Sequence, residues 1–368
     1  MNNHHDQEAQ NAGGIATLLQ PARRGTLSTT GQPRIGEQWT DAPETYYNLP
    51  LLKKAHWGWE IITYFFLGGI GGGSYLAATL ADFFGLKRDQ PLVRAGRYLS
   101  LVCMLASPIF LILDLGRPER FHHMLRILKF RSAMSLGSWG ITFFGLCCGL
   151  TAAHQMAKDG LLNWFPFMAR TMRALPVKAI ESIGALFGLF VASYTGVLLS
   201  STAVPIWARA KHLLGPLFLT SGLSTGLSAL SLLLSLGRFK GQHDTLERLD
   251  RAEIITTTTE LGLIAALIPI LGPLAKPLFK GKTGLLFTIG TIVGGLLSPL
   301  MLKLNWRMNK KAPSRSLTIS ASLLTLIGGA ILRTVWILAG RISADNPRDT
   351  HYYNALEWSN RITRRNPS

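Results

Sequence analysis

Charged side chains are scarce in this sequence of 368 residues. Asp, Glu, Lys and Arg make up 16% of the chain, and hydrophobic residues make up 48%. A soluble domain usually has about 25% charged residues. The charges that are present lie mostly in short basic stretches between long apolar runs. This composition argues against an ordinary soluble domain and indicates a chain that crosses a membrane several times.

Acidic residues are few as well. The chain has 20 Asp and Glu residues against 38 Lys and Arg residues, which gives a formal net charge of +18. A basic surplus of this size can indicate a nucleic-acid partner, but such proteins gather their bases on one face or along one helix. Here the bases sit in loops between apolar runs, so we expect no nucleic-acid partner.

Residues that hold metals and haem are also rare. The three cysteines, Cys103, Cys147 and Cys148, lie in apolar runs and form no CxxC motif. They predict small buried side chains rather than ligands of an iron–sulfur cluster or a metal ion. Five histidines are placed at the ends of apolar runs or in the loops between them, which disfavours a bis-histidine haem: His56, His122, His123, His154 and His212. The first residues show no basic and then apolar leader, so we expect no cleaved signal peptide.

Eight apolar runs are long enough to cross a bilayer as helices. Because each spanning segment must satisfy its own backbone hydrogen bonds, we predict an all-α polytopic bundle of about eight transmembrane helices within residues 51–340. A polar segment, 1–50, precedes it and is expected to be flexible or bound to a partner, and a polar tail, 341–368, follows it. The predicted spans are 57–84, 98–115, 136–155, 179–201, 213–236, 254–275, 284–304 and 317–339.

The loops between these runs predict the orientation of the chain. Loops on the side of the two termini hold 10 Lys and Arg residues, and the opposite loops hold 16. Cytoplasmic loops are enriched in Lys and Arg. We therefore expect both termini on the non-cytoplasmic side, although five bases in the N-terminal segment weaken the bias.

The first apolar run, 57–85, carries the most unusual pattern. Glu60 lies at its mouth, and five glycines follow within 68–73. An acid inside a membrane span indicates function. Glycines in a span allow another helix to approach closely, and they would equally accept a flat ring.

A second motif, 113–140, joins spans two and three. Asp114 and Arg117 come first, and Ser135, Ser138 and Trp139 open the next span. Two interpretations remain open. Asp114 and Arg117 can pair at a helix end as an ordinary interfacial pair, or they can belong to a polar pocket at the mouth of the bundle.

Other polar residues leave similar alternatives. Trp207, in the third motif at 193–226, is placed either as an interfacial anchor or as a ligand contact. Glu181, Glu260 and Arg333 lie inside predicted spans. They either form part of a proton path or are paired residues that hold the bundle together.

Five segments, taken in order, resemble the membrane-subunit family of polysulfide reductase over about residues 45–340. Any one segment is a weak match. Where the family pattern usually has Pro and Trp, this chain has Ala133 and Leu136, which affects the shape of the proposed pocket. The matching segments are 57–73, Asp114-Leu115-Gly116-Arg117-Pro118, 132–139, 194–207 and Leu332-Arg333.

The resemblance implies an eight-span subunit in the cytoplasmic membrane of a bacterium or archaeon. Such a subunit holds no haem or iron–sulfur cluster. It exchanges electrons between a membrane quinone, menaquinone or ubiquinone, and a ferredoxin-like iron–sulfur subunit, which serves a molybdopterin-type catalytic subunit. The chain is then the quinone-reactive part of an oxidoreductase and is not expected to be active alone.

From the motifs and the resemblance together we expect Glu60, Asp114 and Arg117 to be catalytic. Quinone carbonyls need hydrogen-bond donors and a group that exchanges protons, and Arg117 can stabilise negative charge that develops on a ring oxygen. The predicted quinone-binding residues are Trp57, Glu60, Tyr64, Gly68, Arg117, Ser135, Trp139 and Trp207.

Three alternatives remain. One is a membrane subunit of a quinol-oxidising alternative complex III, whose related chains usually have near ten spans. Another is a secondary transporter, which would need broken helices at matching positions in two halves. The last is an anchor without a quinone site.

Overall fold

A computed structural model describes residues 51–52, 55, 57–237, 242–309 and 314–365. The predicted N-terminal segment, 1–50, lies outside the described residues. Residues Leu52–Asp345 form one compact unit. The described residues are helical without strands, and eight of their helical segments are long and apolar enough to cross a membrane. The prediction of an all-α bundle with about eight spans is confirmed.

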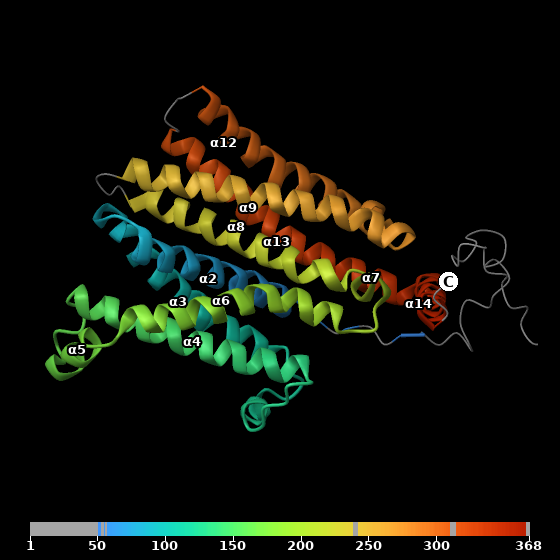
Figure 1. Ribbon diagram of the computed structural model, residues 1–368, viewed down its shortest axis with the longest axis horizontal. Helices are drawn as coiled ribbons and strands as arrows, with labels where there is room; N and C mark the ends of the chain where they lie inside the picture. The colour runs from blue at the N-terminus through green and yellow to red at the C-terminus, as the bar shows by residue number, and fades with distance from the viewer. Residues whose placement is uncertain (1–50, 53–54, 56, 238–241, 310–313, 366–368) are drawn as a thin grey trace, which may run out of the picture. The chain divides into compact units, whose positions relative to one another are not determined.

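The eight spans follow one another along the chain and alternate in direction (Figure 1). Three short helical connectors lie between spans, η3 (Pro118–Leu125), α5 (Pro166–Arg173) and α7 (Pro205–Arg209), and the helix α14 (Pro347–Arg365) follows the last span in the chain. The spans are α2 (Trp59–Phe84), η2 with α3 (Lys87–Asp89, Gln90–Leu113), α4 (Ala133–Lys158), α6 (Val177–Ser200), α8 (Lys211–Gly237), α9 with η4 and α10 (Gln242–Leu271, Gly272–Ala275, Lys276–Phe279), α11 with η5 and α12 (Gly281–Leu285, Leu286–Leu297, Ser298–Met308), and α13 (Arg315–Asp345).

Two spans begin earlier than their hydropathy predicts. The second begins by Gln90 rather than residue 98, and the sixth includes about ten more residues at its start. In the second span, Arg97 is 1% exposed and is bound by Glu181 and Gln155. Charges that are paired inside the bundle need no water, so the helix continues past them.

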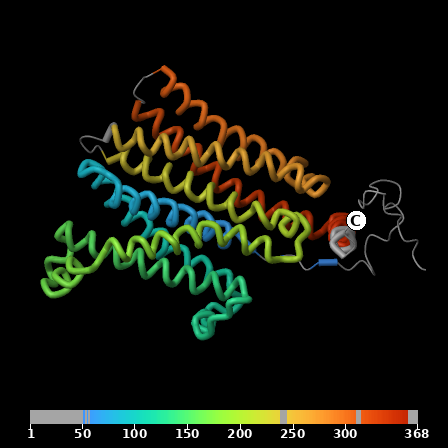
Figure 2. Tube along the Cα trace, in the orientation of Figure 1, coloured from blue at the N-terminus to red at the C-terminus, as the bar shows by residue number. Residues whose placement is uncertain are grey.

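The glycines of α2 let neighbouring helices approach it closely. A Cβ on Gly72 would lie 2.5 Å from the Gly188 carbonyl oxygen of α6, and one on Gly73 would lie 2.4 Å from the Gly222 oxygen of α8. The α2 helix therefore packs against both α6 and α8, which also contact each other (Figure 2). Gly72 and Gly73 therefore serve helix packing, because the backbones of α6 and α8 occupy the space that a flat quinone ring would need beside them.

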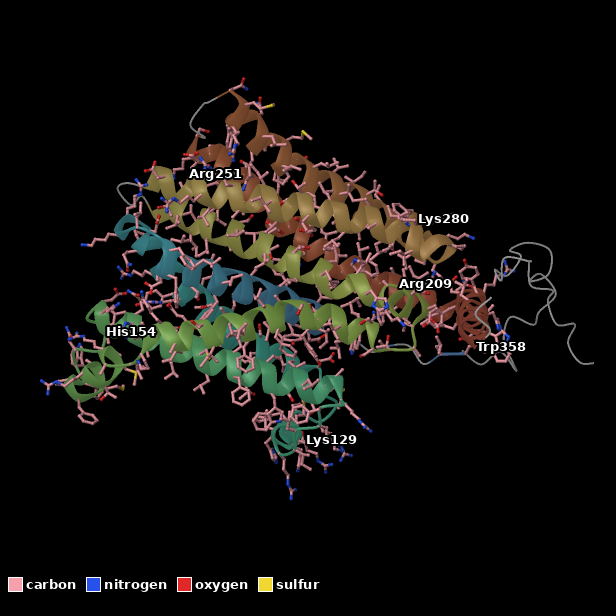
Figure 3. The ribbon with its side chains drawn as sticks, viewed as in Figure 1. Lys129, His154, Arg209, Arg251, Lys280 and Trp358 are labelled. Carbon is pink, nitrogen blue, oxygen red and sulfur yellow. The ribbon has the colours of Figure 1, made fainter. Side chains whose placement is uncertain are left out.

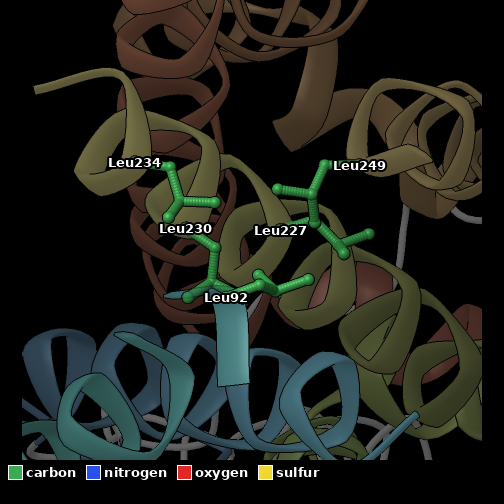
Figure 4. Packing of buried hydrophobic residues seen from close by; sticks show 5 residues of the cluster. All are labelled: Leu92, Leu227, Leu230, Leu234 and Leu249. Atoms are coloured by element: carbon green, nitrogen blue, oxygen red, sulfur yellow. The ribbon is translucent and has the colours of Figure 1, made fainter. Parts of the chain in front are cut away.

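Two groups of spans meet along α2, α3 and α8. The spans α2, α3, α4 and α6 lie on one side, and α9, α12 and α13 lie on the other side of α8 (Figure 1). A leucine cluster joins α3 to α8 and α9 at one end of this seam (Figure 4), and its members are Leu92, Leu227, Leu230, Leu234 and Leu249. Leu92, Leu227 and Leu249 also line a cavity of about 240 Å³ at this junction, together with polar side chains that include Asp89, Thr245 and Arg248.

Candidate functional site

Most of the predicted site residues lie at one end of the bundle. The alternating spans bring the start of α2, the end of α3, the start of α4 and the connectors η3 and α7 to that end. In Figure 3, Lys129 and Arg209 mark this end, and His154 and Arg251 lie at the opposite end. We call these the η3 end and the α5 end, after the connectors that they hold.

Asp114, Arg117 and Ser135 lie around the loop between α3 and α4. Asp114 ends α3 as a half-buried C-cap, and Arg117 is exposed at the start of η3. The Ser135 hydroxyl accepts from the Lys129 N–H at 3.0 Å and donates to the Ile127 carbonyl at 3.2 Å. Ser135 therefore fixes the loop over the start of α4, and the structure assigns it this structural contact.

An apolar cavity of about 200 Å³ lies beside this loop, between α3, η3 and α4. Its hydroxyl groups come from Ser138, which donates to the Ser135 carbonyl at 3.0 Å, and from Thr142, which donates to the Ser138 carbonyl at 2.8 Å. The other lining residues are Met104, Pro108, Leu111, Ile112, Leu115, Phe121, Met124, Leu125, Ile141 and Gly145. Leu115 is the residue of the Asp114–Arg117 motif that lines the cavity, whereas Asp114 and Arg117 themselves are not among its lining residues.

The predicted residues of α2 do not line this cavity. Glu60 is half-buried in the first turn of α2. Tyr64 is 1% exposed, and its hydroxyl has no hydrogen-bond partner within the described part of the chain. A Cβ on Gly68 would meet Val191 of α6 at 3.5 Å, an ordinary contact. A buried hydroxyl without a partner is costly, so Tyr64 is a donor available to a bound group.

Trp57 and Trp207 are brought together at the same end. Their rings stack at 5.3 Å between centroids, with planes 20° apart. Trp207 is fully buried and donates from Nε1 to the Trp336 carbonyl of α13 at 2.9 Å. The Arg341 side chain donates to the Trp57 carbonyl at 2.6 Å. Trp207 therefore attaches α7 to α13 from inside the bundle, and an exposed interfacial position for it is wrong.

Trp139 differs from its neighbours in the same motif. Its ring packs 5.6 Å from that of Phe143, one turn along α4. Its Nε1 is buried and has no hydrogen-bond partner among the residues that the structure describes. Trp139 does not line the cavity that Ser138 lines, so the two neighbours face different surroundings.

Two buried ionic clusters lie toward the α5 end. Arg97 donates to one Glu181 oxygen from Nε at 2.9 Å and from Nη2 at 2.5 Å, and to Gln155 at 2.8 Å. Lys303 pairs with Glu253 in the other cluster. Sequence reasoning identified Glu181 as a buried acid but treated Arg97 as a loop base. In the sequence, the only sign that Arg97 lies inside the second span is that it directly precedes the apolar run that begins at residue 98.

Metal-ligating side chains are not gathered in any part of the chain that the structure describes. Within those residues, no group of three or more His, Cys, Asp or Glu side chains is arranged to hold a metal ion. The cysteines are buried and unpaired.

Comparison with known proteins connects this architecture to a family. The family described as "Polysulphide reductase, NrfD" matches residues 50–344. A polysulfide reductase polypeptide of Wolinella succinogenes is 26% identical over 303 residues, which covers 77% of this chain and 94% of the relative.

Two further relatives match shorter regions. A selenate reductase subunit of Mesobacillus selenatarsenatis is 31% identical over 94 residues, 26% of this chain and 21% of that protein. A putative dimethyl sulfoxide reductase membrane subunit of Halobacterium salinarum is 28% identical over 78 residues, 21% of this chain and 18% of that protein. The family match spans all eight apolar helices. This chain is a multi-pass membrane protein that belongs to the polysulphide reductase NrfD family, whose members include membrane subunits of reductase complexes.

Proposed function

We propose that this chain is the quinone-reactive membrane subunit of a respiratory oxidoreductase complex. It exchanges electrons between the membrane quinone pool and an iron–sulfur subunit, which connects to a molybdopterin-type catalytic subunit. The observation that carries the proposal is the match to the Wolinella polysulfide reductase polypeptide along 94% of that protein. The loop charges support placing the η3 end and both termini outside the cytoplasm.

The cavity beside η3 supports a site for a quinone ring. Its volume of about 200 Å³ is below the roughly 300–1,000 Å³ of sites for drug-sized ligands. A single ring fits such a volume, and an isoprenoid tail would then extend into lipid. Quinone chemistry takes up or releases two protons with two electrons, so the site needs donors and a proton-exchanging group.

The chain's own residues supply these groups at the η3 end. The Ser138 hydroxyl lines the cavity and can turn from a backbone carbonyl toward a ring oxygen. Arg117, at the adjacent loop, offers positive charge to a reduced oxygen. We propose Asp114 as the group that exchanges protons there. Glu60 and Tyr64, on α2, are proposed to carry protons at the same end.

Blocking the cavity tests the proposal. Gly145 lines it, and a Cβ there meets no atom within 4 Å. A Gly145→Leu side chain fills more than half of the cavity, since each of its four carbons occupies about the 30 Å³ of a water molecule. We expect the assembled complex to lose at least about tenfold in kcat/KM for quinol, which is about 1.4 kcal/mol.

A matched control lies one turn along the same helix. Gly149 also has no atom within 4 Å of a Cβ, but it does not line the cavity. Gly149→Leu should leave quinol kinetics within about twofold of the unaltered complex. Equal kinetics for both leucine variants would contradict the cavity as the quinone site. Arg117→Ala and Glu60→Gln with unchanged rates would contradict the proposed roles of these residues.

A further inference from the structure

A second cavity, of about 240 Å³, lies between α2, η2, α3, α8 and α9. Three members of the leucine cluster in Figure 4 line it. Its polar lining side chains, Asp89, Thr245 and Arg248, come from η2 and from the first turns of α9. Arg251, one turn further along α9, lies at the α5 end of the bundle (Figure 3). The cavity near the α5 end therefore combines a mostly apolar wall with one polar rim.

The apolar part of this cavity is lined by small side chains. Ala77 and Ala81 lie four residues apart on α2, which places them on one face of that helix, and Ala252 comes from α9. Two other lining residues of α2, Leu80 and Phe84, are 49% and 81% exposed. On a spanning helix such apolar surface meets lipid tails, so the cavity opens toward the bilayer.

A lipid chain is the occupant that a bilayer supplies to an apolar cavity of this kind. Atoms that line an unfilled space lose the van der Waals contacts that a neighbour would offer on that side. If each carbon occupies about the 30 Å³ of a water molecule, the 240 Å³ holds roughly eight carbons, a stretch of one acyl chain. Lipid tails are as apolar as leucine, so contact with a chain selects no particular lipid. Selection therefore depends on the polar rim.

The polar rim is built around Arg248. The Asp89 carboxylate accepts from Arg248 Nη1 at 2.9 Å, from the Thr245 hydroxyl at 2.7 Å and from the Leu86 backbone N–H at 2.8 Å. The Asp89 side chain is 3% exposed, whereas that of Arg248 is 46% exposed. A guanidinium has five N–H donors, and the bond to Asp89 fixes Arg248 in place with one of them. The exposed side of Arg248 thus presents positive charge and N–H donors at the mouth of the cavity.

The segment η2 adds two more bases to this rim. Lys87 and Arg88 directly precede Asp89, and both are exposed. Arg88 pairs with Asp244 of α9, and the two side chains are 45% and 49% exposed. An ion pair this exposed is weak, so Arg88 can turn toward a stronger acceptor. Guanidinium groups match the geometry of a phosphate, which accepts two parallel N–H bonds.

We propose that this cavity binds an anionic phospholipid, with one acyl chain between α2, α3, α8 and α9 and with its phosphate bonded by Arg248. The chain then contacts both groups of spans that meet at α8, and the lipid stabilises their junction. In the orientation proposed above, the site lies in the cytoplasmic leaflet, where basic pockets between spans bind anionic head groups. The proposal does not depend on quinone chemistry.

Native mass spectrometry of the purified chain in a mild detergent tests the proposal. Phosphatidylglycerol and phosphatidylcholine with identical tails are titrated separately, so that a difference in affinity reports the head group. Phosphatidylglycerol should bind at least about tenfold more tightly. Arg248→Gln should abolish this preference, and Arg248→Lys, which keeps the charge, should retain part of it.

Filling the apolar part tests the chain separately from the head group. Ala252→Leu adds three carbons, about 90 Å³ if each occupies the 30 Å³ of a water molecule, which is over a third of the cavity. It should weaken phosphatidylglycerol binding at least about tenfold. A ligand that binds the folded state stabilises it. Phosphatidylglycerol should therefore raise the thermal unfolding midpoint of the unaltered chain but not that of Ala252→Leu.

Two residues of α9 provide matched controls. The Arg251 side chain is 55% exposed, Ala265 is exposed, and neither lines the cavity. Arg251→Gln and Ala265→Leu should bind phosphatidylglycerol within about twofold of the unaltered chain. An equal loss in these controls would overturn the site.

Three other results would also overturn it. One is equal affinity of the unaltered chain for the two lipids, and another is unaltered binding in both Arg248→Gln and Ala252→Leu. The third is displacement of bound phosphatidylglycerol by a competitor of different chemistry. Displacement by soluble glycerol phosphate would indicate a phosphate site without an acyl chain, and displacement by an equal concentration of quinone would assign the cavity to quinone.

Discussion

Two glycines of α2 should respond in opposite ways to the same methyl group. In Gly73→Ala the new Cβ would lie 2.4 Å from the Gly222 carbonyl oxygen and 3.1 Å from Leu223 Cα, both backbone atoms of α8. Backbone atoms cannot rotate away, so α2 and α8 must separate. In Gly68→Ala the Cβ meets only Val191 Cγ1 at 3.5 Å, which is ordinary van der Waals contact.

The magnitudes follow from two opposing terms. Alanine in a helix is favoured over glycine by about 1 kcal/mol. Overpacking a core costs about 1–3 kcal/mol, and a backbone clash belongs at the upper end. We expect Gly68→Ala to gain up to about 1 kcal/mol and Gly73→Ala to lose about 2 kcal/mol. A loss of this size lowers the unfolding midpoint by roughly 4 °C or more in a domain of 150–250 residues.

Thermal unfolding of the purified subunit in detergent measures this difference. Equal midpoints for the two variants would refute the packing of α2 against α8. Quinol kinetics of Gly68→Ala add a second test, because the sequence predicts Gly68 as a quinone-binding residue. A glycine that only spaces α2 from α6 should tolerate alanine with unchanged kinetics, whereas a glycine beneath a bound ring should not.

Two further predictions concern the hydrogen bonds of two buried side chains, Trp207 of α7 and Asp89 of η2. Trp207→Phe removes the donor to the Trp336 carbonyl and should cost about 1–3 kcal/mol; its midpoint should fall, while that of the exposed Trp164→Phe should not. Asp89→Ala removes a carboxylate that accepts from three donors at 2.7–2.9 Å, the backbone N–H of Leu86 just before η2 and the side chains of Thr245 and Arg248 of α9. We expect a lower midpoint than for Asp244→Ala, whose carboxylate is 49% exposed, and an equal midpoint would contradict a structural role for Asp89.

Spans were the most predictable part of this molecule. Apolar length alone predicts eight of them, because water is absent from the bilayer core and the helix must satisfy its own backbone there. Their boundaries were less predictable. Arg97 and Glu253 count as loop charges in a hydropathy profile, yet each is neutralised by a partner more than 45 residues away along the chain.

The candidate site was predictable only as an end of the bundle. Counting spans places Glu60, Asp114, Arg117 and Trp207 at one end, and the helix order agrees. Which side chains meet there depends on helix rotation and loop conformation, which no local pattern contains. The cavity beside η3, and the Tyr64 hydroxyl that finds no hydrogen-bond partner among the described residues, appear only when the helices are packed.

Photoaffinity labelling with a quinone that carries an azide on its ring tests the central claim most directly. The assembled complex is labelled, digested and analysed by mass spectrometry, with excess unmodified quinone as the competitor. We predict competed labels on residues of α3, η3 and α4 within 104–145, and their loss in Gly145→Leu but not in Gly149→Leu. Competed labels confined to other helices, or labels that quinone does not displace, would contradict a quinone site at the η3 end.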